Sequence, residues 1–451
     1  MHINRLTIEN LRSLETAELD LNTPGTNPHA MFANVNVVLG ANGFGKTTVL
    51  RAAVLAVLGP LLSSSSGFVA ESLIRRRPGT RPGKALLPPA VIHADVELDS
   101  AELPTYARPL VGGPLGMNSQ IVSLGTSEIL KSDVSPGGPI VERLQHDDSA
   151  TAFFMVAYGA TRRVEASSRV DESARLKQRL RRYERVAGLF EDHVTLVPLS
   201  YWLPDYETRN KGRYSQVISL INELLPEACR IRQKSVATPG GREHLFDMNG
   251  VTLPFRALSD GYRAYIGWIG DMLFHLCMGA ASGAKLVDTR GVVLVDEIDL
   301  HLHPEWQRVV LPTLSRALPN VQFIVTTHSP LVVGSLEATN LFTLVEQDGA
   351  VTVKRLPEDV YGRSAEQILL SPYFGLDTTR AAGVSTELET LAQAAVNGDA
   401  DASMRYLRLL SSGESAPPTA SKAPLKKSAP KKSATPPTSG KAKKARQQHA
   451  G

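Results

Sequence analysis

Apolar and polar positions alternate along this chain with two different periods. Short apolar runs at residues 35–39 and 291–295 are typical of strands that are buried on both faces. The stretches 48–58 and 304–317 have the apolar spacing of amphipathic helices, and a further apolar strand is predicted at 321–327. Strands that alternate with helices form a largely parallel sheet, so the pattern predicts an α/β fold.

Other segments predict antiparallel strands and a helical lobe. Between residues 85 and 165, short β-like segments alternate with turns rich in Gly and Pro, which predicts an antiparallel β region. Two strands around Asn249-Gly250 predict a hairpin, and residues 341–356 predict another. Helix-prone segments at 172–191 and 215–228 predict a small helical lobe. The arginines of the first segment either contact nucleic acid or form a solvated face with acidic neighbours, and we favour the second interpretation.

The end of the chain differs in composition from the rest. Short helices are expected from residue 364 to residue 410, and residues 411–451 are rich in Ser, Ala, Pro and Lys, which predicts a disordered tail. The last 37 residues, 415–451, carry nine Lys or Arg and no Asp or Glu, so the net charge of +4 becomes −5 for residues 1–414. The body is therefore mildly acidic, and only the tail offers a basic surface to nucleic acid.

Composition indicates a protein of the cytoplasm with no membrane span. With 451 residues, 42% of them hydrophobic, the chain can bury a sizeable core. Cys229 and Cys277 form no disulfide framework, and no Cys/His cluster has zinc-site spacing, which fits a reducing compartment. The N-terminus reads as a strand rather than a signal peptide. The longest apolar stretch, 264–281, contains Asp271 and His275, which predicts a buried helix.

A phosphate-binding loop follows the first buried strand. Gly40, Gly45, Lys46 and Thr47 stand at the spacing of the nucleotide-binding pattern, between a predicted strand and a predicted helix. Backbone N–H groups and the helix N-terminus converge there on an anionic phosphate. Lys46 is expected to reach the β- and γ-phosphates, and Thr47 to bind Mg²⁺. The predicted nucleotide-binding residues of this segment are Gly40, Ala41, Asn42, Gly43, Phe44, Gly45, Lys46, Thr47 and Thr48.

Three polar residues follow two other buried strands, at the edge of the sheet where ligands bind in open α/β folds. Asp296 is expected to hold Mg²⁺ beside Thr47, and Glu297 to orient or deprotonate the attacking water. His328 ends the next strand and can hydrogen-bond the γ-phosphate or that water. The predicted catalytic residues are therefore Glu297, His328 and Lys46, and the predicted metal ligands are Thr47 and Asp296.

The segment Leu258-Ser259-Asp260-Gly261-Tyr262 is a second device for binding phosphate. Ser259 is a natural N-cap for a long helix that is expected to end near residue 280, and Gly261 permits close approach. One nucleotide does not need two helix N-termini from distant parts of one chain unless the second serves a neighbouring subunit. Ser259, Asp260 and Gly261 are therefore expected to bind the nucleotide of a second copy, which predicts a homodimer or a higher even-numbered oligomer.

These motifs, in this order, resemble those of ABC-type ATPases, in which the signature of one subunit closes over the ATP of the other. Ser259 and Gly261 match the Leu-Ser-Gly-Gly-Gln-like signature, whereas Asp260 and Tyr262 replace the usual Gly and Gln. Residues 298–304 are similar to those of the soluble RecF-like, SMC-like and OLD-like members. The resemblance implies ATP and Mg²⁺ as cofactors.

The resemblance also implies roles for two loops. Asp299 would belong to the D-loop of the family. No glutamine loop is evident, but residues 158–163 occupy about its place in the chain. There, Arg162 and Arg163 either sense phosphate or form an exposed pair at a helix start.

The implied architecture is an ABC-ATPase head with a mostly parallel core sheet, an antiparallel β subdomain and a small helical lobe. The expected layout is a single ATPase domain, 1–410, followed by the basic tail, 411–451. Within the domain, the expected parts are the nucleotide-binding core (1–60 and 285–360), the antiparallel β region (85–165), the helical lobe with the signature (170–283) and C-terminal helices (361–410).

A closer resemblance, over roughly residues 1–400, is to the ATPase subunits of Septu-type and retron-linked anti-phage systems. It rests on residues 257–264, 361–364 and 373–380. It implies an ATPase that regulates a partner effector, an HNH nuclease, since the chain has no HNH-like Cys/His signature of its own. Nucleic acid would be reached through the partner or the basic tail.

Two other functions stay open at this point. A RecF-like or SMC-like DNA-repair ATPase would bind DNA through the basic tail and residues 175–185. An OLD-like ATPase would carry its own Toprim nuclease domain. The segment Leu344-Val345-Glu346 superficially resembles the start of such a domain, but no later Asp-x-Asp follows on an apolar strand.

Overall fold

The computed structural model describes residues 1–25, 30–64, 68–76, 87–125, 127–164, 181–238, 241–281, 283–347 and 349–412. The described residues form two compact units, one within residues 1–379 and one that begins at residue 380. The first unit contains all the motifs that predict chemistry.

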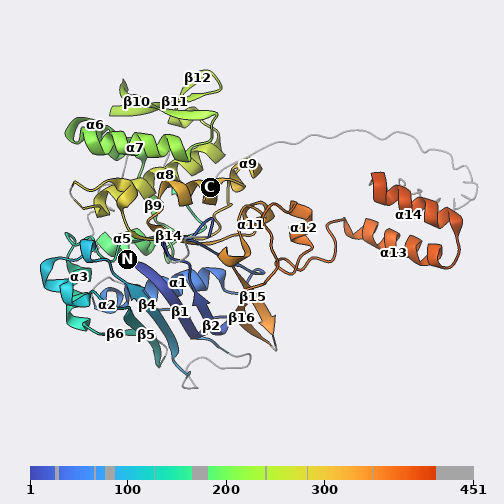
Figure 1. Ribbon diagram of the computed structural model, residues 1–451, viewed down its shortest axis with the longest axis horizontal. Helices are drawn as coiled ribbons and strands as arrows, with labels where there is room; N and C mark the ends of the chain where they lie inside the picture. The colour runs from blue at the N-terminus through green and yellow to red at the C-terminus, as the bar shows by residue number, and fades with distance from the viewer. Residues whose placement is uncertain are drawn as a thin grey trace, which may run out of the picture. The chain divides into compact units, whose positions relative to one another are not determined.

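A large mixed sheet lies at the centre of the first unit (Figure 1). In the described residues its strand order is β6-β5-β4-β1-β2-β16-β15-β3-β14-β13-β7. The strands are β1 (His2–Leu11), β2 (Leu14–Asp20), β3 (Val35–Leu39), β4 (Ala90–Glu97), β5 (Leu115–Leu124), β6 (Ser127–Ser135), β7 (Met155–Tyr158), β13 (Gly291–Val295), β14 (Val321–Thr326), β15 (Leu341–Gln347) and β16 (Ala350–Lys354).

This one sheet has a parallel and an antiparallel half, whose members differ from the predicted regions. Strand β7, in the predicted antiparallel region 85–165, pairs in parallel with β13, whereas β1 and β2, in the predicted core, pair in antiparallel fashion. Strands β15, β3, β14, β13 and β7 pair in parallel. Strands β2, β1, β4, β5 and β6 pair in antiparallel fashion. The halves meet where Val351 of β16 pairs with Leu14 of β2. Because β3, β14, β13 and β7 run in the same direction, their carboxyl ends share one edge, and the segments that follow them meet there.

Helices cover both faces of the sheet, as the α/β pattern predicts. Alternate residues of one strand face opposite cores: Leu294 packs in one hydrophobic cluster, and Val293 and Val295 pack in the other. The first cluster includes helices α1 (Lys46–Val57) and α5 (Arg181–Ala187), beside α2 (Gly59–Ser64) and α3 (Gly138–His146). The second cluster includes α6 (Leu199–Arg209), α7 (Lys211–Leu224), α8 (Asp260–Gly279) and α10 (Val310–Ala317).

The two segments of the predicted helical lobe pack apart. Helix α5, from segment 172–191, belongs to the first cluster, and α7, from segment 215–228, belongs to the second. Helix α7 begins four residues earlier than predicted because the side chain of Asn210 accepts a hydrogen bond from the N–H of Arg213 at 3.0 Å. It ends at Leu224, just before the Leu225-Pro226 pair, since a residue before proline disfavours the helical conformation. A three-stranded sheet of β10 (Cys229–Thr238), β11 (Gly241–Met248) and β12 (Val251–Pro254) includes the predicted Asn249-Gly250 hairpin and lies beside α6 and α7 (Figure 1).

The predicted helix 304–317 is interrupted. It forms α9 (Pro304–Gln307) and α10 (Val310–Ala317), with Arg308 and Val309 between them. Pro312 explains the break, because it has no N–H to donate to the carbonyl four residues earlier, at Arg308, and its ring crowds that carbonyl.

The arginine-rich segment 172–191 is described only from residue 181. Its Arg182 is 3% exposed and donates hydrogen bonds to five backbone carbonyls, those of Leu144, Asp147, Ala150, Ala152 and Phe153. Arg185 lies over the ring of Phe154, 5.1 Å from its centroid. At these two positions the expected solvated face is wrong, because both side chains pack into the fold.

Shorter elements complete the described chain. The first unit also contains the two-stranded sheet of β8 (Arg163–Val164) and β9 (Thr195–Leu196), and helices α11 (Pro330–Val333) and α12 (Ala365–Leu369). Short 3₁₀ helices occupy Ser100–Glu102, Thr105–Leu110, Phe255–Ala257, Leu286–Asp288 and Ala338–Asn340.

The second unit contains α13 (Ala382–Val396) and α14 (Ala400–Ser412), which pack on each other. Most of the predicted tail, from residue 413, lies outside the described residues. Of the helices that the structure describes, none has the length and apolar character needed to cross a membrane.

Candidate nucleotide site

The phosphate-binding loop connects β3 to α1, as the sequence predicts. The Lys46 side chain, 7% exposed, turns back over the loop, and its Nζ donates to the carbonyls of Gly40 at 2.8 Å and Ala41 at 3.1 Å. Gly45 has φ of +99°, and a Cβ there would lie 2.5 Å from Ser13 Oγ, so a residue without a side chain is needed. The loop thus holds its cation and its backbone N–H groups around one space.

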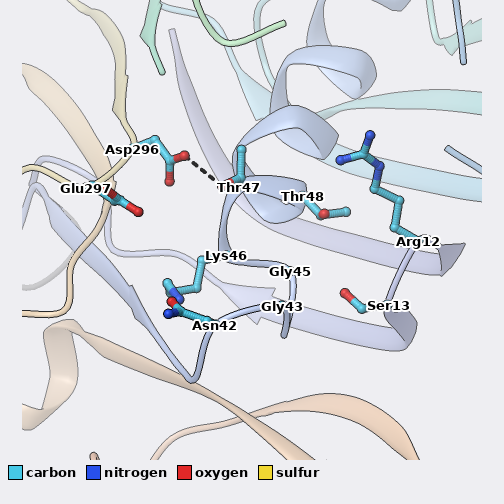
Figure 2. A pocket seen from close by; sticks show the side chains of 10 residues that line it. All are labelled: Arg12, Ser13, Asn42, Gly43, Gly45, Lys46, Thr47, Thr48, Asp296 and Glu297. Atoms are coloured by element: carbon cyan, nitrogen blue, oxygen red, sulfur yellow. Dashed lines mark hydrogen bonds between the residues drawn. The ribbon is translucent and has the colours of Figure 1, made fainter. Parts of the chain in front are cut away.

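That space is a cavity of about 350 Å³ at the shared edge of the parallel strands (Figure 2). Asn42, Gly43, Gly45, Lys46, Thr47 and Thr48 line it from the loop, and Arg12, Ser13, Asp296 and Glu297 line it from other elements. A cavity bounded by backbone N–H groups, a lysine and carboxylates suits a phosphate chain with a divalent cation.

Asp296 lies directly beside the start of α1 (Figure 2). The hydroxyl of Thr47 donates to Asp296 Oδ2 at 2.7 Å, and the hydroxyl of Thr326 donates to Oδ1 at 2.6 Å. Asp296 is 5% exposed, so these donors compensate for the lost hydration of the carboxylate. The oxygen atoms of Thr47 and Asp296 are ligands that Mg²⁺ prefers, and they fit an ion that also takes ligands from phosphate and water.

Burial and neighbouring charge act in opposite directions on Lys46. Burial lowers the pKa of Lys46 from its ordinary value, and attraction to Asp296, Glu297 and Asp299 partly offsets this effect. A phosphate in the cavity would add further negative charge and favour the protonated lysine.

Glu297 has an unusual backbone conformation, with φ of +48°. Its N–H donates to Thr326 Oγ1 at 2.7 Å, and its carboxylate side chain lines the cavity beside Asp296. A carboxylate in this position can accept a proton from a water molecule at the phosphate.

His328 follows β14, as predicted, and belongs to the same charged group. Burial lowers the pKa of His328, and Lys46 lowers it further, while Asp299, Glu297 and Asp296 oppose this effect. The buried Nε2 has no hydrogen-bond partner among the described residues. The lowered pKa favours the neutral imidazole, and His328 is not one of the residues that line the cavity.

The signature segment lies at the start of α8, but in a different cavity. Ser259 occupies the N-cap position without a hydrogen bond from its side chain to the helix, and Asp260 pairs with Arg263. A Cβ at Gly261 would lie 3.1 Å from the carbonyl of His301. The cavity, of about 530 Å³, is lined by Ser259, Gly261, Tyr262, His301, Leu302, His303, Glu305 and Trp306.

The two cavities share no lining residue. One copy of the chain therefore brings together Lys46, Thr47, Asp296 and Glu297, and it does not add Ser259 or Gly261 to them.

Sequence reasoning missed Arg12 and Ser13, and it named Arg162 without predicting the partners of that side chain. Arg12 and Ser13, in the turn between β1 and β2, line the phosphate cavity although no motif marks them. Arg162 lies in the turn after β7 and donates to the carbonyls of Asp296 and Glu297, both at 2.8 Å. It is thus neither at a helix start nor one of the residues that line the cavity. The side chain of Arg163 lies outside the described residues.

Comparison with known families gives two matches of AAA domains to this sequence. The family "AAA domain, putative AbiEii toxin, Type IV TA system" matches residues 137–334, and a second family, "AAA domain", matches residues 5–79. Together these ranges contain the phosphate loop, the signature, both carboxylates and His328. In these two parts the chain is therefore similar to AAA-type ATPase domains.

Within that class, it is distantly homologous to Septu and retron proteins. It is 33% identical to the Retron Ec83 probable ATPase of Escherichia coli, over 36% of this chain and 29% of the relative. It is 35% identical to the Septu protein PtuA of Bacillus thuringiensis, over 28% of this chain and 33% of the relative. The similarity thus spans about a third of the length of these curated relatives.

A solved structure is similar over a longer part. The SmcHead bound to the C-winged helix domain of ScpA matches 79% of this chain and 98% of its own, with 14% identity and a TM-score of 0.47.

Proposed function

We propose that this chain binds ATP with Mg²⁺ in the cavity at residues 40–48 and hydrolyses it. The observation that carries the proposal is the hydrogen bond of 2.7 Å between Thr47 and Asp296, in a cavity that Lys46 and Glu297 also line. Loop N–H groups and Lys46 would bind the β- and γ-phosphates, and Thr47 and Asp296 would hold the metal ion. When bound, Mg²⁺ would neutralise charge that develops on the phosphate oxygens.

Glu297 and His328 supply the groups for hydrolysis. The Glu297 carboxylate would orient the attacking water and accept its proton. The neutral His328 would donate a hydrogen bond to the γ-phosphate or accept one from that water, through the ring nitrogen that has no partner in the described fold. Lys46 would stabilise negative charge in the transition state.

A second copy would complete the site. Ser259, Asp260 and Gly261 lie at a helix N-terminus that is separate from the phosphate cavity of their own chain. A helix N-terminus attracts phosphate, so we place this segment over the γ-phosphate bound by another copy. The chain would then act as a homodimer or a higher even-numbered oligomer that ATP closes and hydrolysis opens.

We further propose that this cycle controls a partner effector. Homology to Septu and retron ATPases supports a role in anti-phage defence, with an HNH nuclease as the effector. The basic tail offers a route to nucleic acid. Both cysteines are free and buried, which suits work in the cytoplasm.

Glu297→Gln tests the ATP-driven closure. The variant should bind ATP but not hydrolyse it, and sedimentation with ATP and Mg²⁺ should show a dimer that is absent without nucleotide. Lys46→Ala is the matched control, because it weakens phosphate binding and should stay monomeric. A Glu297→Gln chain that remains monomeric at saturating ATP would rule out the closure, and a wild-type chain without ATPase activity would rule out hydrolysis.

A further inference from the structure

Glu297 is held in a backbone conformation that residues with side chains seldom adopt. Its φ of +48° lies in the left-handed region, where Cβ approaches the following carbonyl. Such a conformation persists only when the surrounding structure over-determines it. The direction in which the Glu297 side chain leaves the backbone therefore depends on the groups that hold its peptide units.

Five hydrogen bonds hold those peptide units. Two are backbone bonds, from the N–H of Ile298 to the carbonyl of Thr326 at 2.9 Å and from the N–H of Leu300 to the carbonyl of Glu297 at 3.0 Å. The other three involve side chains. Thr326 Oγ1 accepts the N–H of Glu297 at 2.7 Å. Arg162 Nη2 donates to the carbonyl of Glu297 at 2.8 Å, and its Nη1 donates to the carbonyl of Asp296 at 2.8 Å. The guanidinium thus bridges two successive carbonyls, and this needs the planar fork of donors that arginine has and lysine lacks.

The same guanidinium touches the helix that carries the signature. It lies 5.8 Å from the ring centroid of Trp268, which belongs to α8. Tyr158, four residues before Arg162, packs edge-to-face on Trp268 at 6.1 Å and donates a hydrogen bond of 2.7 Å to Asp271, also in α8. The turn after β7 is therefore fastened to α8 on one side and to the backbone of Glu297 on the other.

Charge is consistent with this placement. Burial lowers the pKa of Arg162 to about 10, and Asp296, Asp299 and Glu297 attract the cation. Arg162 is therefore protonated at neutral pH and keeps all of its donors.

We propose that Arg162 is a positioning residue that sets the direction of Glu297 and links it to α8. A shift of α8, when its signature end meets the nucleotide of another copy, would move Trp268 and Arg162 and so align the Glu297 carboxylate. The inference rests on the proposed hydrolysis at Glu297 and adds a route by which engagement of the signature is sensed.

Turnover provides the first test. Arg162→Lys keeps the charge but not the fork, so kcat should fall about 10- to 100-fold, while KM for ATP changes by less than about threefold. Arg182→Lys is the matched control, because Arg182 also binds backbone carbonyls but lies away from the cavity, and its kcat should stay at the wild-type value. A rise in KM alone, with kcat at the wild-type value, would contradict the assignment.

Hydrogen exchange of the full chain provides a test that needs no turnover. Arg162→Lys should speed amide exchange at residues 297–299 by about tenfold or more. Trp268→Leu should do so as well, although Arg162 is intact. Trp202→Leu is its control, because Trp202 and Trp268 are both 3% exposed in the same cluster and, of the two, Trp268 is the one that contacts Arg162.

The two tests separate the two proposals. Faster exchange without any ATPase activity in the wild-type chain would support the positioning role and remove the proposed hydrolysis. Unchanged exchange at residues 297–299 in both variants would overturn the positioning role, whatever the ATPase activity.

Discussion

Thr47 and Asp296 lie 249 positions apart in the sequence and share a hydrogen bond of 2.7 Å. The bond joins the first turn of α1 to the end of β13, because β3 and β13 run in parallel on either side of β14. A hydroxyl and a carboxylate that already meet in the fold need little rearrangement to bind one cation.

The hydroxyl of Thr47 should be needed for metal-dependent binding. Thr47→Val keeps the shape and removes the oxygen, so the affinity for ATP with Mg²⁺ should fall about 10- to 100-fold. Thr47→Ser keeps the oxygen and should stay within a few-fold of the wild type. Calorimetric titration with and without Mg²⁺ measures both, and equal affinities of the Val and Ser variants would remove Thr47 from the metal site.

A bulky residue at Ser259 should separate binding from hydrolysis. Ser259→Arg places a long side chain in the signature cavity and leaves the phosphate cavity intact, since the two share no residue. Binding of ATP should be nearly unchanged, whereas the turnover rate should fall by about 10²-fold or more. Filter binding and phosphate release measure the two quantities, and wild-type turnover would show that the signature serves no second copy.

Two glycines of the loop offer a matched pair. Gly43 has φ of +83°, and a Cβ added there would meet no atom within 4 Å, so Gly43→Ala should cost about 1 kcal/mol of backbone strain. Gly45→Ala adds an approach of 2.5 Å to Ser13 Oγ, so it should lower the melting temperature more and also weaken ATP binding. Thermal melts with and without ATP compare the two variants, and equal effects would mean that Ser13 moves freely.

The buried His244 should make the helical lobe sensitive to acid. Burial lowers its pKa from 6.5 to about 4, with Arg242 adding to the effect and Glu207 opposing it. The unfolded chain takes up a proton below about pH 6.5, but the folded chain does so only near pH 4. Stability is therefore full above pH 6.5 and is lost as the pH falls toward 4, by up to about 3 kcal/mol.

His244→Phe should reduce this loss, because it removes the titrating ring. The hydroxyl of Tyr214, which contacts His244 Nε2 at 2.8 Å, keeps its bond to the Gln233 carbonyl. Melting temperatures at pH 7.5 and pH 5.0 give the difference for each protein. An equally large acid shift in the variant would assign the effect to other groups.

The sequence predicted the elements around the cavity because each carries a strong local signal. The sequence alone shows the buried strands, the glycine loop and the strand-end carboxylates, and parallel pairing of the strands brings them to one edge of the sheet. The fusion of both sheet regions was not predictable, since it depends on β16 meeting β2 across more than 300 residues of chain. Neither was the role of Arg182, whose five carbonyl partners are contributed by the tertiary fold.

Arg162 shows why positioning contacts escape sequence reasoning. Its partners are backbone carbonyls, which every residue has. No motif of particular residue types at a fixed spacing therefore predicts these contacts. The positive φ of Glu297 was not predictable from the sequence either, because glutamate is not a residue that favours the left-handed region.

The separation of the two cavities has a consequence for how the ATPase activity depends on the concentration of the chain. If each complete site takes one wall from each of two copies, the number of complete sites rises with the square of a dilute chain's concentration. At chain concentrations below the dissociation constant of the dimer, halving the concentration would then remove about three quarters of the ATPase activity. The ATPase activity of such a chain would be very low at low abundance and would rise steeply with its concentration.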